Sequence, residues 1–355
     1  MSDAGAKASS SAVEVEARAR EILSSDVFRL VAAGAGEEET LRQNREAFGR
    51  WRLVAAETEL VETPSTRTRV LVKPVALPVL AAPVSFQHVL HPDGDLGSAR
   101  AAARAGTVAC LSLASTTSVT DLAEAIPGGR RWFQIQCFED SSLTRRLIEA
   151  AVDTGVEALV FTADSPYPGR RDRSLRRTSW LPEGAALPSW ATETDEQRPA
   201  PANAHSDWSE DLDFLVRASP LPVIVKGVMS ASEARLACDH DAAAVIVSNH
   251  GGRHVDGVPA TLDVLEDVVK EVAGRVEVLV DGGVRCGADV VKALALGARA
   301  VLVGRPVAWA LAADGEQGVA ELFEVLREEV EQALATIGCA GADAVPRAAV
   351  APVGS

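Results

Sequence analysis

The stretch VIVSNHGGRHVDGVPA, residues 245–260, holds the residues best suited to chemistry. The apolar run Ala243–Val247 predicts a strand buried on both faces, and it breaks at once into SNHGGR, which contains His250 and Arg253. Histidine titrates near neutral pH, arginine is a fixed cation that grips anions, and paired glycines let a backbone approach a ligand. This pattern predicts a base and an anion clamp at the end of a strand. The alternative is an ordinary turn with a solvated histidine.

A lysine, Lys226, lies in a second apolar run, VIVKGV. It could form a Schiff base, or it could be a fixed charge beside a cofactor ring. A flavin ring favours the second interpretation, because an ammonium at its pyrimidine edge stabilises the anionic reduced form. Gln134 and Thr162 would then donate or accept hydrogen bonds at the same ring.

Glycines and an arginine follow two more apolar runs. VDGGVR contains Gly283 and Arg285, VLVGRP contains Gly304 and Arg305, and a helical pattern follows each. Backbone N–H groups at such turns and the positive end of a helix bind phosphate, and barrels place this site after strands seven and eight. The two turns therefore predict a phosphorylated ligand, although many Gly-Gly turns are only structural.

These residues need a scaffold, and the chain repeats one pattern that supplies it. Eight short apolar runs predict strands at Val79–Ala82, Val108–Leu113, Trp132–Cys137, Ala158–Asp164, Val223–Val228, Ala243–Asn249, Val278–Gly283 and Ala300–Gly304. Helical patterns follow at Gly97–Ala105, Val119–Ile126, Leu143–Thr154, Trp208–Arg217, Ala231–Cys238, Leu262–Val272, Ala288–Leu296 and Pro306–Ala312. The alternation predicts an α/β fold, a (β/α)8 TIM barrel, with an open doubly wound sheet as the alternative.

Function in a barrel lies where the strands end, and every predicted strand ends near a polar residue. These residues are Ser85, Ser112, Gln134, Gln136, Thr162, Asp164, Lys226, Ser248, His250, Asp281 and Arg305. The longest gap between elements, Ser165–Ser206, is rich in Pro, Arg, Ser and Glu. We expect it to form a long lid loop after strand four.

The ends of the chain are expected to lie outside this pattern. Residues 1–12 predict a disordered leader, residues 13–341 one barrel domain, and residues 342–355 a weakly ordered C-terminal tail. Apolar residues at helical spacing from Ala12 to Ala33 stop at Gly34 and Gly36, where a helix would end, and an acidic helix begins near Glu37. A last acidic helix over Glu316–Ala335 is expected to close the barrel.

Composition excludes several classes of function. The 355 residues carry a net charge of −15, which argues against nucleic acid or an anionic membrane surface as the partner. No apolar run reaches the length of a membrane span, and the polar N-terminus does not fit a secretory signal. The five cysteines form no C-x-x-C pair, so the sequence predicts no metal site and favours a reducing, cytoplasmic location.

Several motifs together carry a family resemblance. SNHGGR, VDGGVR-x-G-x-D-x-x-KALALGA, the FQ of strand three, TADSPYPGRR-D, VKGV and GAGEEETLRQN occur between about Val13 and Gly341. In these motifs the chain resembles the FMN-dependent α-hydroxy acid oxidases and dehydrogenases, the family of glycolate oxidase, lactate oxidase and mandelate dehydrogenase.

The resemblance implies FMN as cofactor and a role for each matching residue. His250 would be the catalytic base oriented by Asp164, while Arg171 and Arg253 would hold the substrate carboxylate. The implied contacts to the flavin ring, ribityl chain and phosphate are Pro83, Val84, Ser85, Ser112, Gln134, Thr162, Lys226, Ser248, Asp281, Gly283, Arg285, Gly304 and Arg305. Dioxygen or another acceptor would reoxidise the flavin. A homo-oligomer, as a tetramer, is the implied assembly.

The chain departs from the family pattern around the substrate. Leu30 and Gln136 stand where the family has tyrosines, Ala114 stands where some members have a bulky aromatic residue, and Tyr167 is the only tyrosine. The pocket is therefore expected to have gained room and apolar surface, which favours a bulky or aromatic hydroxy acid. The alternatives are a modified or carrier-bound biosynthetic intermediate, or a flavin protein that has lost turnover.

One more departure lies beside the expected base. His254 replaces a residue that is often glutamine in the family. We expect a solvated or cofactor-side polar contact there, with a second proton-transfer group as the alternative.

Overall fold

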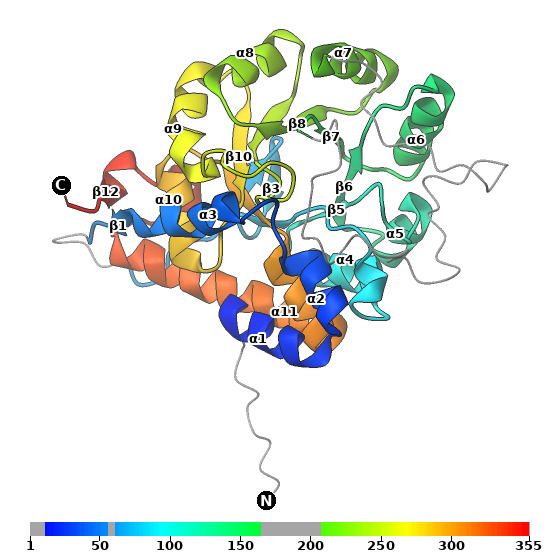
Figure 1. The fold of residues 1–355 in the computed structure, drawn as a ribbon. Coiled ribbons are helices and arrows are strands. Elements are labelled where there is room, and N and C mark those ends of the chain that lie inside the picture. Colours follow the sequence, from blue (N-terminus) through cyan, green and yellow to red (C-terminus); the bar gives the residue numbers. More distant parts are fainter. Residues whose placement is uncertain (1–10, 56–60, 165–206, 355) are drawn as a thin grey trace, which may run out of the picture.

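Eight parallel strands close into a barrel in the computed structural model, which describes residues 11–55, 61–164 and 207–354 (Figure 1). Their order around the barrel is β10-β11-β4-β5-β6-β7-β8-β9. The strands are β4 (Val79–Ala81), β5 (Val108–Leu111), β6 (Arg130–Ile135), β7 (Ala158–Thr162), β8 (Val223–Val228), β9 (Ala244–Val247), β10 (Glu277–Asp281) and β11 (Ala300–Val303). Val301 pairs with Val79, so the sheet has no open edge there and the predicted TIM barrel is confirmed.

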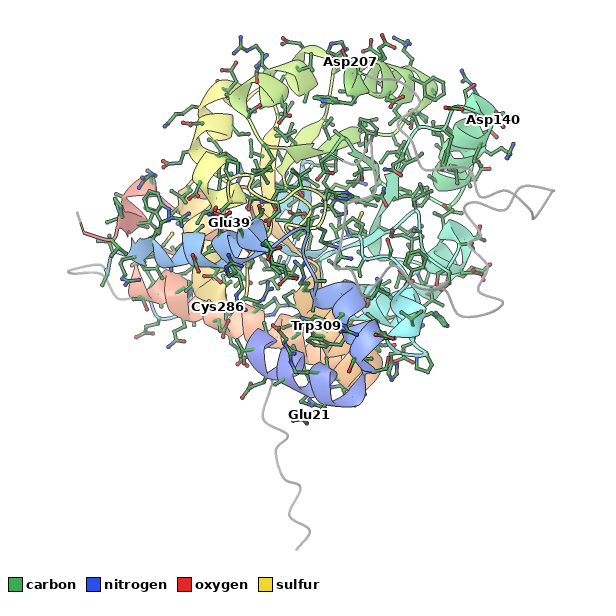
Figure 2. All side chains as sticks on the ribbon, in the orientation of Figure 1. Glu21, Glu39, Asp140, Asp207, Cys286 and Trp309 are labelled. Carbon is green, nitrogen blue, oxygen red and sulfur yellow. The ribbon has the colours of Figure 1, made fainter. Side chains whose placement is uncertain are left out.

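Helices follow the strands and surround the barrel (Figure 1). They are α4 (Gly94–Arg104), α5 (Val119–Ala125), α6 (Ser141–Asp153), α7 (Trp208–Ala218), α8 (Ala231–Asp239), α9 (Thr261–Val272), α10 (Gly287–Ala295) and α11 (Arg305–Thr336). Side chains cap the N-termini of several helices. Asp140 and Asp207, labelled in Figure 2, accept hydrogen bonds from backbone N–H groups in the first turns of α6 and α7. The two helices predicted after Arg305 both fall within α11, whose helical geometry breaks at Asp314 and Gly315.

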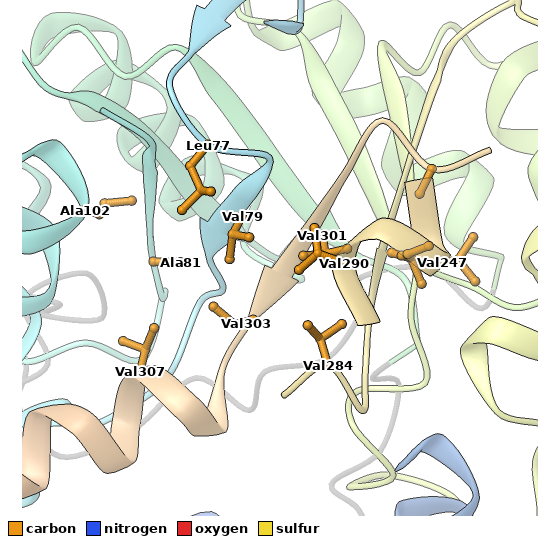
Figure 3. Packing of buried hydrophobic residues seen from close by; sticks show 14 of the residues in the cluster. Leu77, Val79, Ala81, Ala102, Val247, Val284, Val290, Val301, Val303 and Val307 are labelled. Atoms are coloured by element: carbon orange, nitrogen blue, oxygen red, sulfur yellow. The ribbon is translucent and has the colours of Figure 1, made fainter. Parts of the chain in front are cut away.

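Side chains along each strand alternate between two apolar clusters. Val79 and Ala81 of β4 pack outward against helices, together with Val301 and Val307 in the close view of Figure 3. Leu80 of β4 points to the other side and belongs to a separate cluster inside the barrel. The barrel is thus filled by side chains and has no pore.

A hairpin closes the N-terminal end of the barrel. It consists of β2 (Thr68–Val70) and β3 (Lys73–Val75), whose buried valines pack with the interior cluster. The N–H of Leu71 donates to Glu277 at the start of β10, at 2.8 Å. Ligands therefore reach the described barrel from its other end, where the strands finish.

Three helices precede the barrel: α1 (Ala12–Ile22), α2 (Ser25–Ala32) and α3 (Glu39–Gly49). The helix expected from Ala12 to Ala33 is in fact two, because Leu23 after the first helix is extended and the Ser24 hydroxyl caps the second by accepting from the N–H of Val27. Phe28 of α2 stacks on Trp309 with ring centroids 4.6 Å apart. Figure 2 shows Trp309 beside α2 at the start of α11, so this stack fixes α2 over the mouth of the barrel.

The C-terminal segment differs from the expected tail. Strand β12 (Val350–Pro352) pairs antiparallel with β1 (Trp51–Leu53), and two short 3-10 turns, Ala342–Ala344 and Arg347–Ala349, lead to it. Arg347 lies over the Trp51 ring, at 4.7 Å from its centroid. This segment therefore packs against β1 through strand pairing and the Arg347–Trp51 contact, which composition does not reveal.

Three expectations concern residues outside the described ranges: most of the leader, the lid over residues 165–206, and Arg171 within it. A third 3-10 turn lies at Gln87–Val89. Among the described helices, none has the length and apolar character needed to cross a bilayer.

Candidate active site

A cavity of about 350 Å³ lies at the C-terminal ends of the barrel strands. Of the predicted site residues, its lining includes Leu30, Pro83, Val84, Ser85, Ser112, Ala114, Gln134, Gln136, Thr162, Lys226, His250, Arg253, Asp281, Gly283, Arg285, Gly304 and Arg305. Ser248 and Asp164 lie behind this wall and contact lining residues. The convergence expected from the strand ends is therefore present in the structure.

Uncharged groups line one side of the cavity, from β4 to β7. The hydroxyls of Ser85 and Ser112 are 3.1 Å apart, and Ser112 donates to Oε1 of Gln134 at 3.3 Å. The same oxygen accepts from the N–H of Leu113 at 3.0 Å, while Nε2 of Gln134 donates to the Thr162 hydroxyl at 3.0 Å. We call Ser85, Ser112, Gln134 and Thr162 the neutral arc. Its members orient one another and fix which way the Gln134 amide points.

Charged groups line the opposite side. Lys226 of β8, 4% exposed, forms an ion pair with Asp281 of β10 at 3.2 Å and donates to the Ser248 hydroxyl at 2.8 Å. Burial lowers the pKa of Lys226, but Asp281 and Asp164 outweigh it, so the net pKa is raised. A lysine held as a cation is a poor nucleophile, which favours the fixed charge over the Schiff base.

His250 lies on this side of the cavity too, in a turn with left-handed backbone conformation. Its φ is 56°, and those of Gly251 and Gly252 are 63° and 73°. A β-carbon on Gly252 would meet the backbone N of Leu41 in α3 at 2.8 Å, so this turn needs glycine. A non-glycine residue at positive φ costs free energy and indicates a position set by its surroundings.

A reciprocal amide pair, which sequence reasoning missed, fixes the turn to α3. Nδ2 of Asn44 donates to Oδ1 of Asn249 at 2.8 Å, and Nδ2 of Asn249 donates back at 2.9 Å. Asn249 Oδ1 also accepts from the N–H of Gly252 at 3.2 Å. The signal was the asparagine ending GAGEEETLRQN, which no strand-end argument could have used because it lies on a helix.

The predicted base and its orienting carboxylate are in contact. Nδ1 of His250 lies 3.3 Å from Oδ1 of Asp164. The backbone N–H of His250 donates to the Ser248 hydroxyl at 3.1 Å. Burial raises the pKa of the Asp164 carboxyl, while the charges of Lys226 and His254 act against that rise. We call Asp164, Lys226, His250 and Asp281 the charged arc. It holds both a fixed cation and a group able to exchange a proton.

Two arginines in the wall bind the end of α2. Arg253 donates to the carbonyls of Leu30, Val31 and Ala33 at 2.9–3.0 Å. Arg305 donates to Val31 and Ala33, and also to Gly251 at 2.9 Å. Both side chains thus hold the last turn of α2, and with it Leu30, against the cavity.

Comparison with known proteins identifies this arrangement. Residues 19–352 match the family model described as FMN-dependent dehydrogenase. The chain belongs to this family. It is 38% identical over 340 residues to 2-hydroxyacid oxidase 1 of Homo sapiens, covering 92% of each chain. It is also 38% identical to 4-hydroxymandelate oxidase of Amycolatopsis orientalis, covering 95% of this chain and 97% of that protein.

Solved structures give the same result. A mandelate oxidase bound to (S)-2-phenylpropionate superposes with a TM-score of 0.87 at 39% identity, covering 95% of this chain and 97% of that one. A variant of an active chimera of (S)-mandelate dehydrogenase gives 0.90 at 32% identity, covering 96% and 99%. The protein is an FMN-dependent oxidoreductase of the α-hydroxy acid oxidase and dehydrogenase family, acting on a CH–OH group.

The cavity of this family member fits FMN. Two buried polar atoms at its wall, Oδ1 of Asp281 and Nε of Arg285, have no partner among the described residues, and they suit the hydroxyls and phosphate of the cofactor. A β-carbon on Gly304 would meet Val84 and Ala82 no closer than 3.6 Å, so protein packing does not require this glycine. Its open face leaves room for a ligand against the backbone at the start of α11.

Glycine is required at position 283 for a different reason from the expected phosphate contact. Its φ is 90°, and a β-carbon there would overlap the carbonyl oxygen of Asn44. The glycine is therefore needed for packing against α3, whatever it contributes to phosphate binding. Beside it, burial lowers the pKa of Arg285 to about 10, which leaves the guanidinium charged at neutral pH.

Proposed function

We propose that the protein oxidises a bulky or aromatic α-hydroxy acid to the 2-oxo acid, with His250 as the base. The observation that carries this proposal is the Asp164–His250 contact in the wall of a cavity suited to FMN. An imidazole held by a carboxylate next to a flavin site has a direct use in removing a proton from a hydroxy acid.

Each group of the charged arc has a distinct part in the proposed reaction. Asp164 orients His250 and balances the imidazolium that forms when His250 takes a proton from the substrate. Bound FMN would accept the two electrons and pass them to dioxygen or another acceptor. Lys226 would keep a positive charge beside the ring, while Arg253 and Arg171 would hold the substrate carboxylate.

The shape of the pocket supports a larger substrate. Leu30 and Ala114 line it with aliphatic surface, and Gln136, only 7% exposed, makes no hydrogen bond to a described residue. Leu30 cannot donate the hydrogen bond that a tyrosine at this position would give to the substrate. Losing a hydrogen bond to a charged group costs about 1.5–3 kcal/mol. Burying a substrate ring against the aliphatic wall, at about 25 cal/mol per Å², returns a similar amount. The balance favours mandelate-like acids over glycolate or lactate.

A substrate panel tests the proposal. Anaerobic reduction of the flavin is followed by its absorbance with glycolate, lactate, long-chain 2-hydroxy acids and mandelates. We expect mandelates or another bulky acid to reduce it fastest. If glycolate or lactate is the best substrate, the inference of an enlarged apolar pocket is wrong. If neither the free acids nor their amide and thioester derivatives reduce the flavin, the protein has lost turnover.

A second candidate, a carrier-bound or otherwise modified substrate, is favoured by the state of Arg253. Three of its N–H bonds point to backbone carbonyls of residues 30, 31 and 33, which leaves fewer of its five donors for a free carboxylate. Comparing mandelate with its amide and thioester in the same assay distinguishes the two. Faster reduction by the derivatives would favour the second candidate.

We also propose a homotetramer in the cytoplasm. The resemblance supports the tetramer, and five cysteines without a disulfide among the described residues are compatible with a reducing compartment. Light scattering of the purified protein tests the assembly: a mass near four chains is expected, and a monomer would contradict it.

A further inference from the structure

Two imidazoles lie side by side in the cavity wall, although the proposed reaction uses one. The ring centroids of His250 and His254 are 4.1 Å apart, and the ring planes meet at 84°. The three positive φ angles from His250 to Gly252 fold the chain back on itself, which brings residue 254 against residue 250. One turn therefore holds both rings at the cavity.

Asp164 is coupled to both rings. Its Oδ1 contacts Nδ1 of His250, and the charge of His254 stabilises its ionised form. The nitrogens of His254 are shielded from solvent, so water screens this interaction only weakly. One carboxylate thus interacts with two imidazoles, and their titrations must be coupled.

The other charges nearby disfavour two imidazolium ions together. Charged groups of the described residues that line or adjoin this cavity are Asp164 after β7, Lys226 in β8, Asp281 in β10, Arg253 in the same turn, Arg285 after β10 and Arg305 at the start of α11; Asp256, two residues after His254, accepts from backbone N–H groups of Glu37 and Thr40. Lys226 and Asp281 form a pair of their own at 3.2 Å. Asp164 is then the carboxylate that can balance a charged imidazole, and a second positive ring would be repelled by the first.

We propose that His254 is a positioning residue of the proton-transfer step, which shares Asp164 with His250 and so keeps His250 in its neutral, proton-accepting form. This inference rests on the proposed function, because it takes His250 as the base. When His250 takes a proton from the substrate, Asp164 balances the positive charge of the imidazolium. The neighbouring His254 ring then favours release of that proton from His250 to solvent. A glutamine at position 254 would fill similar space without this effect.

The pH dependence of flavin reduction tests the proposal. Rates with saturating substrate are measured anaerobically for the FMN-bound wild type, His254→Gln, His254→Phe and a control, His240→Gln. His240 pairs with Asp213 on α7, away from the cavity. With the second imidazole removed, we expect the acid limb of the profile to move up by about one pH unit, with the alkaline plateau retained. The control should match wild type.

A histidine titration gives a readout that does not depend on turnover. The protein has six histidines, and ¹³C-labelled imidazole signals of the FMN-bound protein can be assigned with His250→Gln and His254→Gln. The pKa of His250 should rise when His254 is replaced. An unshifted His250 signal, an unchanged rate profile, or an equal loss of rate at every pH would overturn the proposal.

The His250 and His254 variants separate the role of the second imidazole from the proposed mechanism. If His250→Gln abolishes flavin reduction while both His254 variants follow the wild-type profile, only the role of His254 is wrong. If His250→Gln reduces its flavin at the wild-type rate, the base lies elsewhere and the proposed mechanism is wrong.

Discussion

The neutral arc and the charged arc form opposite sides of the same cavity but are built on different principles. The hydroxyls and amide of the neutral arc bond to one another in a chain from Ser85 to Thr162, so none of them has to change charge. The charged arc buries Lys226, Asp281 and Asp164 beside a titratable ring. A network of neutral hydrogen bonds can orient a ligand without burying a charge. A buried charge needs an opposite charge or hydrogen bonds beside it, because its loss of hydration is otherwise strongly destabilising. Proton chemistry should therefore depend on one side of the cavity.

The largest expected effect comes from the proton acceptor itself. His250→Gln should retain FMN but lose about 10² to 10⁴-fold in the rate of anaerobic flavin reduction, because a positioned base contributes that much. Stopped-flow absorbance measures the rate, and the spectrum of the released cofactor checks the FMN content. If His250→Gln reduced its flavin as fast as a variant of the neutral arc such as Thr162→Val, the two arcs would not differ in function.

The next effect is on stability, through the buried ion pair. Lys226→Met leaves Asp281 buried without its partner at 3.2 Å, and such a loss costs about 3–5 kcal/mol. Urea unfolding of the FMN-saturated protein at neutral pH measures this. The double variant Lys226→Met, Asp281→Leu is the matched control, and it should regain much of the loss. Equal destabilisation in the single and double variants would show that charge balance is not the cause.

A smaller effect is expected beside the segment that carries Ser85, where one carboxyl is buried and forms no ion pair with a described residue. Burial raises the pKa of Asp95 in α4 from 3.8 to about 7, and Gln87 donates to its Oδ1 at 3.1 Å. Below about pH 4 both folded and unfolded states are protonated; from there to pH 7 only the unfolded state ionises, so stability falls. Asp95→Asn removes this dependence.

Unfolding free energies across pH compare the Asp95 variant with wild type. The difference in favour of Asp95→Asn should grow between about pH 4 and 7, to on the order of 4 kcal/mol, and then level off. A difference that stays constant with pH would mean that Asp95 is ionised in the folded protein, which would place a full charge beside the segment that carries Ser85.

The smallest effect is expected within the neutral arc. Thr162→Val keeps the shape of the side chain but removes the acceptor of the 3.0 Å bond from Gln134. One neutral hydrogen bond is worth about 0.5–1.5 kcal/mol, so FMN affinity should fall by roughly tenfold or less. Fluorescence titration of the apoprotein with FMN measures the affinity at several pH values. A loss that varies with pH would contradict the uncharged character of this arc.

The sequence predicted the strand ends well, because alternation of buried runs and polar residues is a local property. All eight strands lie where the apolar runs placed them, and Lys226, Asp281 and His250 converge as expected. Contacts between distant segments were not predictable in this way. Asn44 meets Asn249 across the helix-to-turn interface, and Arg253 bonds to the end of α2. No periodicity encodes which distant backbone group an arginine or asparagine will reach.

The same limit explains the two errors at the ends. Ser24 splits a run whose apolar spacing fits one helix, since a capping hydroxyl outweighs the pattern. The segment after Gly341 has the composition of a tail, yet Val350 pairs with Leu53 and is buried. Order there is decided by the partner that the segment covers.

Closure of the barrel also bears on how the chain folds. The register that joins Val79 to Val301 brings together strands from opposite halves of the sequence, so it has to wait until almost the whole domain has been synthesised. Until these two strands pair, the free edges of β4 and, once it is made, β11 carry a row of unpaired N–H and C=O groups, which are templates for pairing with other chains. Aggregation during expression should therefore respond to changes in these two strands more than to changes of equal size in the surrounding helices.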